Sequence, residues 1–311
     1  MNQTTNTILM VRPVSFRMNE QTAINNYYQK VIDGLSPETV NERAQEEFDA
    51  FVHKLKMVGV NVIVVHDTKI PDTPDSIFPN NWISFHENGD VVLYPMFAVN
   101  RRAERREDIL DLLEEKGFLI ENVVDYTDAE DEELYLEGTG SLLLDRVHGK
   151  AYCALSPRAD EELLIEFCED FDLGPVIFNA YQTIDDDRRL LYHTNVMMCL
   201  GENFAVICPD SIDDKQERNN VLDNLKKDGK EIISITEDQM NNFAGNMLQV
   251  RGSEGKSYIV MSAAAYKSLR KDQIEALQKH GTILSSSLDT IEACGGGSAR
   301  CMMAEVFLPK A

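Results

Sequence analysis

Cys301 has the clearest potential of any side chain in this sequence to act as a nucleophile. It follows three consecutive glycines at 295–297, stands directly after Arg300 and precedes an apolar run at 302–308. Glycine allows positive φ and close approach of another molecule to the backbone, and an adjacent cation favours the thiolate of a cysteine. A buried structural cysteine behind a flexible turn explains the same stretch equally well. The spacing of the other polar residues therefore has to decide between these two interpretations.

A pattern of helix, glycine and strand recurs five times along the chain. Each predicted helix has apolar residues at helical spacing, ends at a glycine and is followed by a short apolar strand. The glycines Gly59, Gly117, Gly174, Gly229 and Gly281 are 52 to 58 residues apart, and such a period is the signature of a repeat architecture. The predicted helices and strands cover residues 41–58 and 60–65, 101–116 and 118–124, 160–173 and 176–179, 213–228 and 231–235, and 263–280 and 282–286.

A polar turn that opens onto an apolar run follows each glycine after 17 to 22 residues, which gives modules of two strands, a helix and a further strand. Modules of this kind can close radially, so that equivalent strand ends converge on one axis. The sequence therefore predicts an α/β fold, a five-bladed α/β propeller of five ββαβ-type modules around a pseudo-fivefold axis, in a single domain over residues 1–311. We expect the N-terminal strand at 6–14 and the helix at 41–58 to complete the module that opens at the last polar turn. The residues at the five turns are Asn81, Glu137, His193, Asn246 and Cys301.

A carboxylate, an imidazole and a thiol meet at the predicted axis. In such a set the thiolate of Cys301 attacks, His193 moves protons, and Glu137 holds the imidazole or the substrate. Taken alone, His193 also fits a hydrogen-bonded core histidine, and Glu137 also fits the cap of a turn. No cysteine and histidine spacing resembles a zinc site, and the glycine run lacks the lysine of a phosphate-binding loop. The sequence thus predicts a thiol enzyme without metal or cofactor.

The composition excludes several classes of partner. The formal net charge of −23 argues against nucleic acid and anionic membrane surfaces. The first residues lack the pattern of a signal peptide, and no apolar run reaches the length of a membrane span. The six cysteines show no paired spacing, which favours reduced thiols in a cytoplasm. The acidic runs at 125–133 and 185–187 are expected to be solvated loops. Whether the chain forms a homo-oligomer stays open.

Four motifs resemble those of the guanidine-modifying superfamily, also called the amidinotransferase or pentein superfamily. It includes arginine deiminase, dimethylarginine dimethylaminohydrolase and the amidinotransferases. The resemblance implies a five-bladed α/β propeller, a Cys/His/acid site without a cofactor, a substrate-binding loop with Asp75 and Asn81, and an arginine for the substrate carboxylate, for which Arg101, Arg102 and Arg105 are candidates. The motifs are Leu136-Glu137-Gly138, Tyr192-His193-Thr194-Asn195, the segment 295–301 and the segment 75–82.

The departures from the family pattern concern substrate charge. Arginine deiminases usually carry aspartate where Asn81 and Asn195 stand, and Thr139-Gly140 replaces a Gly-Asp pair. Amides match a neutral ureido group better than a guanidinium, which needs carboxylates. The resemblance therefore favours a cysteine-dependent hydrolase that converts L-citrulline and water into ornithine, ammonia and carbon dioxide through a thiol adduct. The alternatives are a guanidine hydrolase or amidinotransferase acting on arginine or methylarginine, and a non-catalytic propeller.

Overall fold

Five three-stranded sheets share one strand order in the computed structural model, which describes residues 2–310. In each sheet the first strand pairs antiparallel with the second, and the second pairs parallel with the third. The predicted order of strand, strand, helix and strand is therefore present in every module. The sheets are β17-β1-β2 (Ala304–Glu305, Thr7–Arg12, Asn61–His66), β3-β4-β5 (Ile83–Phe85, Asp90–Leu93, Asn122–Asp125), β6-β7-β8 (Leu142–Asp145, Lys150–Ala154, Gly174–Phe178), β11-β12-β13 (Met198–Leu200, Phe204–Ile207, Glu231–Ser234) and β14-β15-β16 (Leu248–Arg251, Ser257–Ser262, Thr282–Ser286).

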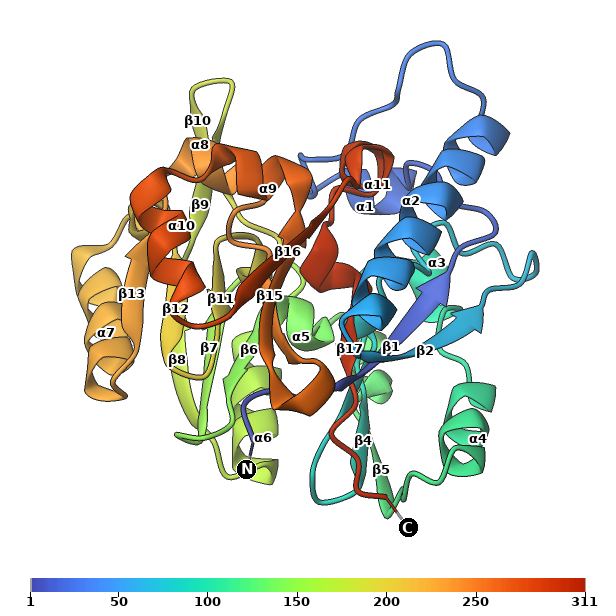
Figure 1. Ribbon diagram of the computed structural model, residues 1–311, viewed down its shortest axis with the longest axis horizontal. Helices are drawn as coiled ribbons and strands as arrows, with labels where there is room; N and C mark the ends of the chain where they lie inside the picture. Colours follow the sequence, from blue (N-terminus) through green and yellow to red (C-terminus); the bar gives the residue numbers. More distant parts are fainter. Residues whose placement is uncertain (1, 311) are drawn as a thin grey trace.

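The helices that connect second and third strands lie on the outside of the molecule (Figure 1). Helix α2 illustrates why, because its buried residues Phe48, Phe51 and Leu55 recur at helical spacing and pack in an apolar cluster while its other face is exposed. Ser36 caps its N-terminus by accepting from the backbone N–H of Thr39. These helices are α2 (Pro37–Met57), α3 and α4 (Val99–Arg102, Asp108–Glu115), α6 (Glu161–Asp170), α7 (Lys215–Lys227), and α9 and α10 (Ala263–Ser268, Lys271–Gln278).

The first and last strands of the chain share a sheet. Strand β1 pairs antiparallel with β17, where Ile8 lies opposite Glu305, and parallel with β2, where Leu9 lies opposite Ile63. The predicted completion of the last module by the N-terminal strand is confirmed. Cys301 therefore belongs to a module assembled from both ends of the described chain.

Two of the five predicted helices are broken. The helix predicted at 101–116 is α3 and α4, and the one at 263–280 is α9 and α10, with Leu269 and Arg270 in extended conformation between them. The predicted glycine stops are right at Gly59, Gly117 and Gly229, which adopt positive φ. They are wrong at Gly174, which begins β8, and at Gly281, which is not left-handed.

The polar turns come together at the entrance to the first strands. Helix α5 (Gly138–Ser141) contacts the 3-10 turns Pro79–Asn81 and Thr194–Val196, and the former also contacts the 3-10 turn Ala299–Met302. Figure 1 shows α5 near the middle of the molecule. The short helix α11 (Asp289–Gly295), which the sequence did not predict, ends at the glycines before Cys301.

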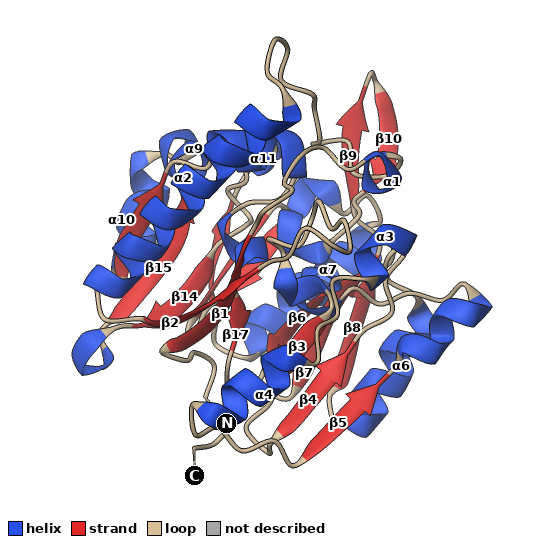
Figure 2. Cartoon of the chain, turned by 90° about the vertical axis from the view of Figure 1, so that its right-hand side faces the viewer, coloured by secondary structure: helices blue, strands red, loops and turns tan. Residues whose placement is uncertain are grey.

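Several short elements lie outside the five modules. The hairpin of β9 (Tyr181–Ile184) and β10 (Asp187–Leu190) projects from the body (Figures 1 and 2), and the acidic residues at 185–187, in its turn and at the start of β10, are exposed. The other acidic run is more structured than predicted, because it forms a 3-10 turn, Thr127–Glu132. The short helices α1 (Glu20–Ala23) and α8 (Glu237–Met240) and the 3-10 turns Pro209–Ser211 and Ser253–Gly255 complete the description. None of the helices within residues 2–310 combines the length and the apolar character that a membrane span requires.

Candidate active site

Glu137 and His193 form a buried carboxylate–imidazole pair. Glu137 stands immediately before α5, and His193 immediately before the 3-10 turn Thr194–Val196, so the contact between these two elements brings them together. His193 Nε2 lies 2.7 Å from Glu137 Oε2, while Glu137 Oε1 accepts from the backbone N–H of Phe97 at 3.1 Å. The carboxylate thus fixes the orientation of the ring, as predicted for a histidine that moves protons.

Two arginines surround the same carboxylate. Arg158 Nη1 is 3.5 Å and Arg101 Nη1 is 3.9 Å from Glu137 Oε2, and all three side chains are buried. Burial opposes ionisation of Glu137, but Arg158, His193 and Arg101 together outweigh it and lower the pKa of this carboxyl. Glu137 is therefore an acceptor at neutral pH, and its hydrogen bond to His193 places the proton of the imidazole on Nε2.

The other ring nitrogen of His193 is the basic one. Burial lowers the pKa of His193, and the positive charges of Arg158 and Arg101 oppose the attraction of Glu137, so the imidazole is neutral at pH 7. Gly140 leaves space beside Nδ1, because a Cβ there would lie 2.8 Å from this nitrogen and 2.5 Å from Asn81 Nδ2. The arrangement is that of a general base with a free lone pair.

The thiol of Cys301 is surrounded by amides instead of charges. Its sulfur lies 3.2 Å from Asn246 Nδ2 and 3.4 Å from Asn195 Nδ2. The structure therefore places the predicted nucleophile and Asn195 together, and Cys301 is buried rather than exposed. The expected help from Arg300 is not found, since that guanidinium binds the carbonyl of Met303 and the carboxylate of Glu305.

The predicted substrate loop lines the same cavity. Asp75 Oδ2 accepts from Asn19 Nδ2 at 2.8 Å and from Thr22 Oγ1 at 3.0 Å, whereas its buried Oδ1 has no hydrogen-bond partner within residues 2–310. Such an orphaned acceptor suits an N–H group of a ligand. Asn81 Oδ1, in contrast, already accepts from Arg101 Nη1 at 2.8 Å.

The three candidate arginines differ in their positions. Arg101 lines the cavity and makes a bidentate contact with Glu104 at 2.8 and 2.9 Å. Arg105 is bonded to Glu130, and Arg102 also approaches that carboxylate, at 3.3 Å. Neither Arg102 nor Arg105 lines the cavity that holds Cys301 and His193.

A segment over residues 19–30, here called the cover, closes the site. Asn26 and Gln29 line the cavity and donate to the carbonyl of Gly295 at 3.4 and 3.0 Å, and Arg158 Nη2 donates to the carbonyl of Thr22 at 2.9 Å. The enclosed space is only about 10 Å³. This is room for about one water molecule, so an amino acid can bind only after lining residues have moved.

Sequence reasoning missed Arg158, Asn26 and Gln29 as site residues, and named Asn246 only as the fourth polar turn. Asn246 was recoverable because its spacing matches that of the other turns. Arg158 and the cover come from loops outside the repeated phrase, where no periodic signal exists. The contact of Arg158 with Tyr192, at 4.9 Å from the guanidinium to the ring centre, likewise has no counterpart in the sequence pattern.

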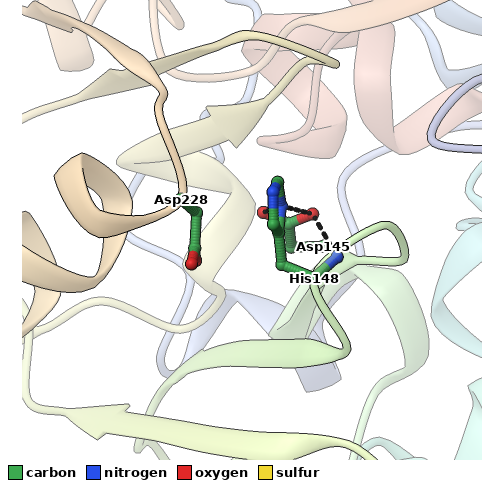
Figure 3. A group of neighbouring side chains, drawn as sticks. All are labelled: Asp145, His148 and Asp228. Carbon is green, nitrogen blue, oxygen red and sulfur yellow. Dashed lines mark hydrogen bonds and ion pairs between the residues drawn. The ribbon is translucent and has the colours of Figure 1, made fainter.

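Asp145, His148 and Asp228 form the one group within residues 2–310 whose ligand atoms are close enough for a metal ion (Figure 3). Two lysines already neutralise its carboxylates. Lys230 Nζ lies 3.0 Å from Asp145 Oδ2, and Lys150 Nζ lies 2.6 Å from Asp228 Oδ2. These ammonium groups oppose the binding of a further cation, so we assign no metal to this cluster.

The sequence as a whole matches a known family model. Residues 12–308 match the model described as eukaryotic N,N dimethylarginine dimethylhydrolase. The chain belongs to this family. It is accordingly a member of the pentein, or amidinotransferase, superfamily, as the four motifs predicted. A comparison with curated protein sequences found no significant match.

Solved structures share the fold at low sequence identity. The N-terminal domain of ArgZ, an arginine dihydrolase from the ornithine-ammonia cycle in Cyanobacteria, matches with a TM-score of 0.72 and 21% identity over 97% of this chain and 99% of that domain. Against longer ArgZ, at a TM-score of 0.73 and 22% identity, this chain covers 41% of the relative's length and 98% of its own. A dimethylarginine dimethylaminohydrolase adduct with S-methyl-L-thiocitrulline matches with a TM-score of 0.64 and 14% identity, over 96% of this chain and 98% of the relative.

Proposed function

We propose that this protein is a cysteine-dependent hydrolase of C–N bonds at the terminal carbon of an arginine-type amino acid. The observation that carries the proposal is the joint burial of Cys301, His193 and Glu137 around one cavity in a chain that matches the dimethylarginine dimethylhydrolase family. A thiol, a base and a carboxylate that orients the base are the parts of covalent catalysis. A non-catalytic protein would have no evident reason to bury these three ionisable groups around one cavity.

The proposed reaction proceeds in two stages. Cys301 Sγ attacks the terminal carbon, its proton passes to His193 Nδ1, and that proton then leaves with the departing nitrogen. The resulting thiol adduct is hydrolysed by a water whose proton His193 accepts, and the thiol is restored. Glu137 holds the ring through both stages. Since Cys301 and His193 share no hydrogen bond within residues 2–310, the substrate has to bridge them.

The comparisons favour a guanidino substrate. ArgZ is an arginine dihydrolase, the related AgrE was solved with L-arginine, and the more distant neighbour is a dimethylarginine dimethylaminohydrolase. These relatives support the alternative, a guanidine hydrolase acting on arginine or methylarginine, over the citrulline hydrolase that the sequence placed first. We therefore propose the guanidino carbon of arginine or a methylated arginine as the point of attack.

Citrulline is retained as a second candidate because of one observation, the amides that contact the thiol. Asn195 and Asn246 offer neutral hydrogen bonds where a guanidinium requires carboxylates. The two candidates are chemically connected. Hydrolysis of a guanidino group yields a ureido group, and attack on the ureido carbon yields a carbamate that loses carbon dioxide and leaves ornithine.

The amino-acid end of the substrate has complementary partners in the cavity. The free Oδ1 of Asp75 suits an ammonium or another N–H group of the substrate. Arg158 and Arg101 are the cations that line the cavity, and either suits a carboxylate. Arg105 keeps its role as a substrate-binding candidate only if the cover and the loop around Glu130 rearrange.

The arrangement of the modules is part of the proposal. We infer that the five sheets surround a pseudo-fivefold axis as an α/β propeller formed by one domain. Contacts of β17 with β3, of β6 with β11 and of β11 with β14 support this arrangement, because they link first strands of neighbouring modules. The proximity of the polar turns follows from the same geometry.

Product analysis on L-arginine, dimethylarginine and L-citrulline tests the proposed function. The guanidine hydrolase is established if a guanidino compound is converted to citrulline or ornithine faster than citrulline is converted to ornithine. A preference for citrulline in kcat/KM of about a hundredfold or more establishes the second candidate. If none of the three compounds is turned over, and none protects Cys301 from alkylation, the proposal is wrong.

A further inference from the structure

Asn246 is an amide that the protein orients as a donor toward the nucleophile. We propose that it is a catalytic residue that stabilises the thiolate of Cys301. The inference rests on the proposed function for the identity of the nucleophile, and it adds a residue that the motif comparison does not include among the catalytic ones.

Two backbone contacts fix which end of the Asn246 amide faces the sulfur. Its Oδ1 accepts from the backbone N–H of Arg300 at 2.9 Å, and its Nδ2 donates to the backbone carbonyl of Asn195 at 2.9 Å. A backbone N–H can only donate and a backbone carbonyl can only accept, so a rotated amide loses both bonds. Nδ2 therefore stays 3.2 Å from Cys301 Sγ with an N–H directed at it.

Asn195 is oriented less firmly. Its Nδ2 lies 3.4 Å and its Oδ1 3.8 Å from the same sulfur, so the amide can donate to a thiolate or accept from a thiol. Asn246 can only donate. Because the sulfur of a thiol is a weak acceptor and a thiolate is a strong one, the fixed donor favours the charged form.

In the described part of the chain neither the nearby histidine nor the nearby guanidinium takes this role, and Asn195 is the other, less firmly oriented donor. His193 is bonded to Glu137, and the guanidinium of Arg300 is bonded to Met303 and Glu305. The sulfur is buried, and a thiolate there would lack the hydration it has in water. A donor held in place before the reaction requires no reorganisation when the charge forms. Asn246 is thus suited to hold the nucleophile ready for attack.

Alkylation of Cys301 by iodoacetamide between pH 5 and 10, followed by peptide mass spectrometry, tests the inference. Asn246→Asp keeps the size of the side chain and the acceptor for the Arg300 N–H, but removes the donor and adds a like charge. Asn246→Ala removes the donor to the sulfur together with both backbone contacts of the amide, and adds no charge. We expect the midpoint of the alkylation profile to rise by about one pH unit in Asn246→Ala and by more in Asn246→Asp, with alkylation at pH 7 about tenfold slower.

Asn80→Ala is the matched control, because Asn80 is a buried amide in another polar turn whose NH2 donates to Thr139 and not to the sulfur. It should keep the wild-type profile. A folded Asn246→Asp or Asn246→Ala protein with the wild-type profile overturns the inference. The assay needs no turnover, so a shifted profile in an enzyme that leaves all tested amino acids unchanged refutes the proposed function and not the role of Asn246.

A measurement on the wild-type protein covers the case in which neither variant folds. The side-chain amide protons of Asn246 should shift in nuclear magnetic resonance spectra with the same pH midpoint as the alkylation, and those of Asn80 should not. Prior alkylation of Cys301 should abolish the shift. A response of Asn246 that is absent, or that has a different midpoint, overturns the inference.

Discussion

The two sides of the cavity achieve their chemistry by different means. The acid–base side contains Glu137 and His193 between two arginines, so buried charges of both signs compensate one another. The thiol side holds Cys301 between two neutral amides. Charges held in place set the protonation state of a base. Fixed neutral dipoles can instead stabilise the thiolate form of a nucleophile without pairing it permanently to a cation. The sulfur thereby stays available to a substrate.

The largest effect is expected on the thiol side. Cys301→Ala should lower turnover by at least about 10⁴-fold, because no other group can form the covalent adduct. The fold should persist, since the turn depends on its glycines more than on the thiol. Release of citrulline or ornithine from the preferred substrate, together with thermal unfolding, measures both. Cys294→Ala, a change of a cysteine in α11, is the control and should retain turnover; substantial turnover by Cys301→Ala would refute the mechanism.

The acid–base side should respond in both activity and stability. Glu137→Gln removes the carboxylate that orients His193 and leaves Arg158 and Arg101 with less compensation. We expect kcat to fall about 10²- to 10⁴-fold and the free energy of unfolding to fall by about 3 kcal/mol. Steady-state kinetics and urea unfolding check this. Glu231→Gln, which removes a carboxylate bonded to His280 at the surface, should change neither quantity appreciably. A loss of kcat below fivefold would contradict the role of Glu137.

Replacing two amides of the cavity by carboxylates should change substrate preference. The double variant Asn81→Asp and Asn195→Asp supplies the carboxylates that a guanidinium needs, so the ratio of kcat/KM for arginine to that for citrulline should rise about 10- to 100-fold. Because Asn81 already accepts from Arg101, most of the change should come from Asn195. Measuring kcat/KM of each single variant on both substrates separates the contributions of the two substitutions. An unchanged or lower ratio would show that the amides do not select substrate charge.

The smallest expected effect concerns the carboxyl of Glu292, in the helix α11 that precedes the glycines before Cys301. Burial raises the pKa of Glu292 to about 7, and this carboxyl accepts from Ser298 Oγ at 2.6 Å. A raised pKa means that the folded protein binds the proton more tightly than the unfolded chain. The resulting stability is fully present below about pH 4.5 and is lost as the pH rises through about 7.

Glu292→Gln should therefore remove a pH-dependent contribution of about 2 kcal/mol to the free energy of unfolding between pH 5 and 8. Urea unfolding of both proteins at several pH values measures the difference. If the free energies of unfolding of the two proteins change in parallel with pH, Glu292 is ionised in the folded protein, and a charge then lies near the neutral thiol side.

The repeat in the sequence predicted the element order and the polar turns that all five modules share, and it missed features that occur in a single module. The matching turns at Glu137, His193 and Cys301 located the candidate site, because each module repeats the same element order. The break in the helix predicted at 101–116 has no glycine or proline to signal it, and it accompanies the burial of Arg101, which binds Glu104 three residues later and Asn81 in another turn. Arg158 reaches the site from a single loop, so no repeated position could indicate it.

Substrate chemistry was the least predictable feature. Residue types at 81 and 195 were read as partners of the substrate, but Asn81 is largely occupied by Arg101 and Asn195 contacts the nucleophile. A single sequence names the residues and not their hydrogen-bond partners. Those partners decide whether an amide selects a neutral substrate or activates a thiol.

The sheet built from β1, β2 and β17 has a consequence for biosynthesis. During translation β1 is made before β17 and before the nucleophile beside it, so this sheet cannot be completed until the whole segment between them has been synthesised. Pairing of such distant segments is slow compared with local contacts. A chain that stops between His193 and Cys301 therefore has the histidine and its carboxylate but lacks both the thiol and the strand that completes this sheet.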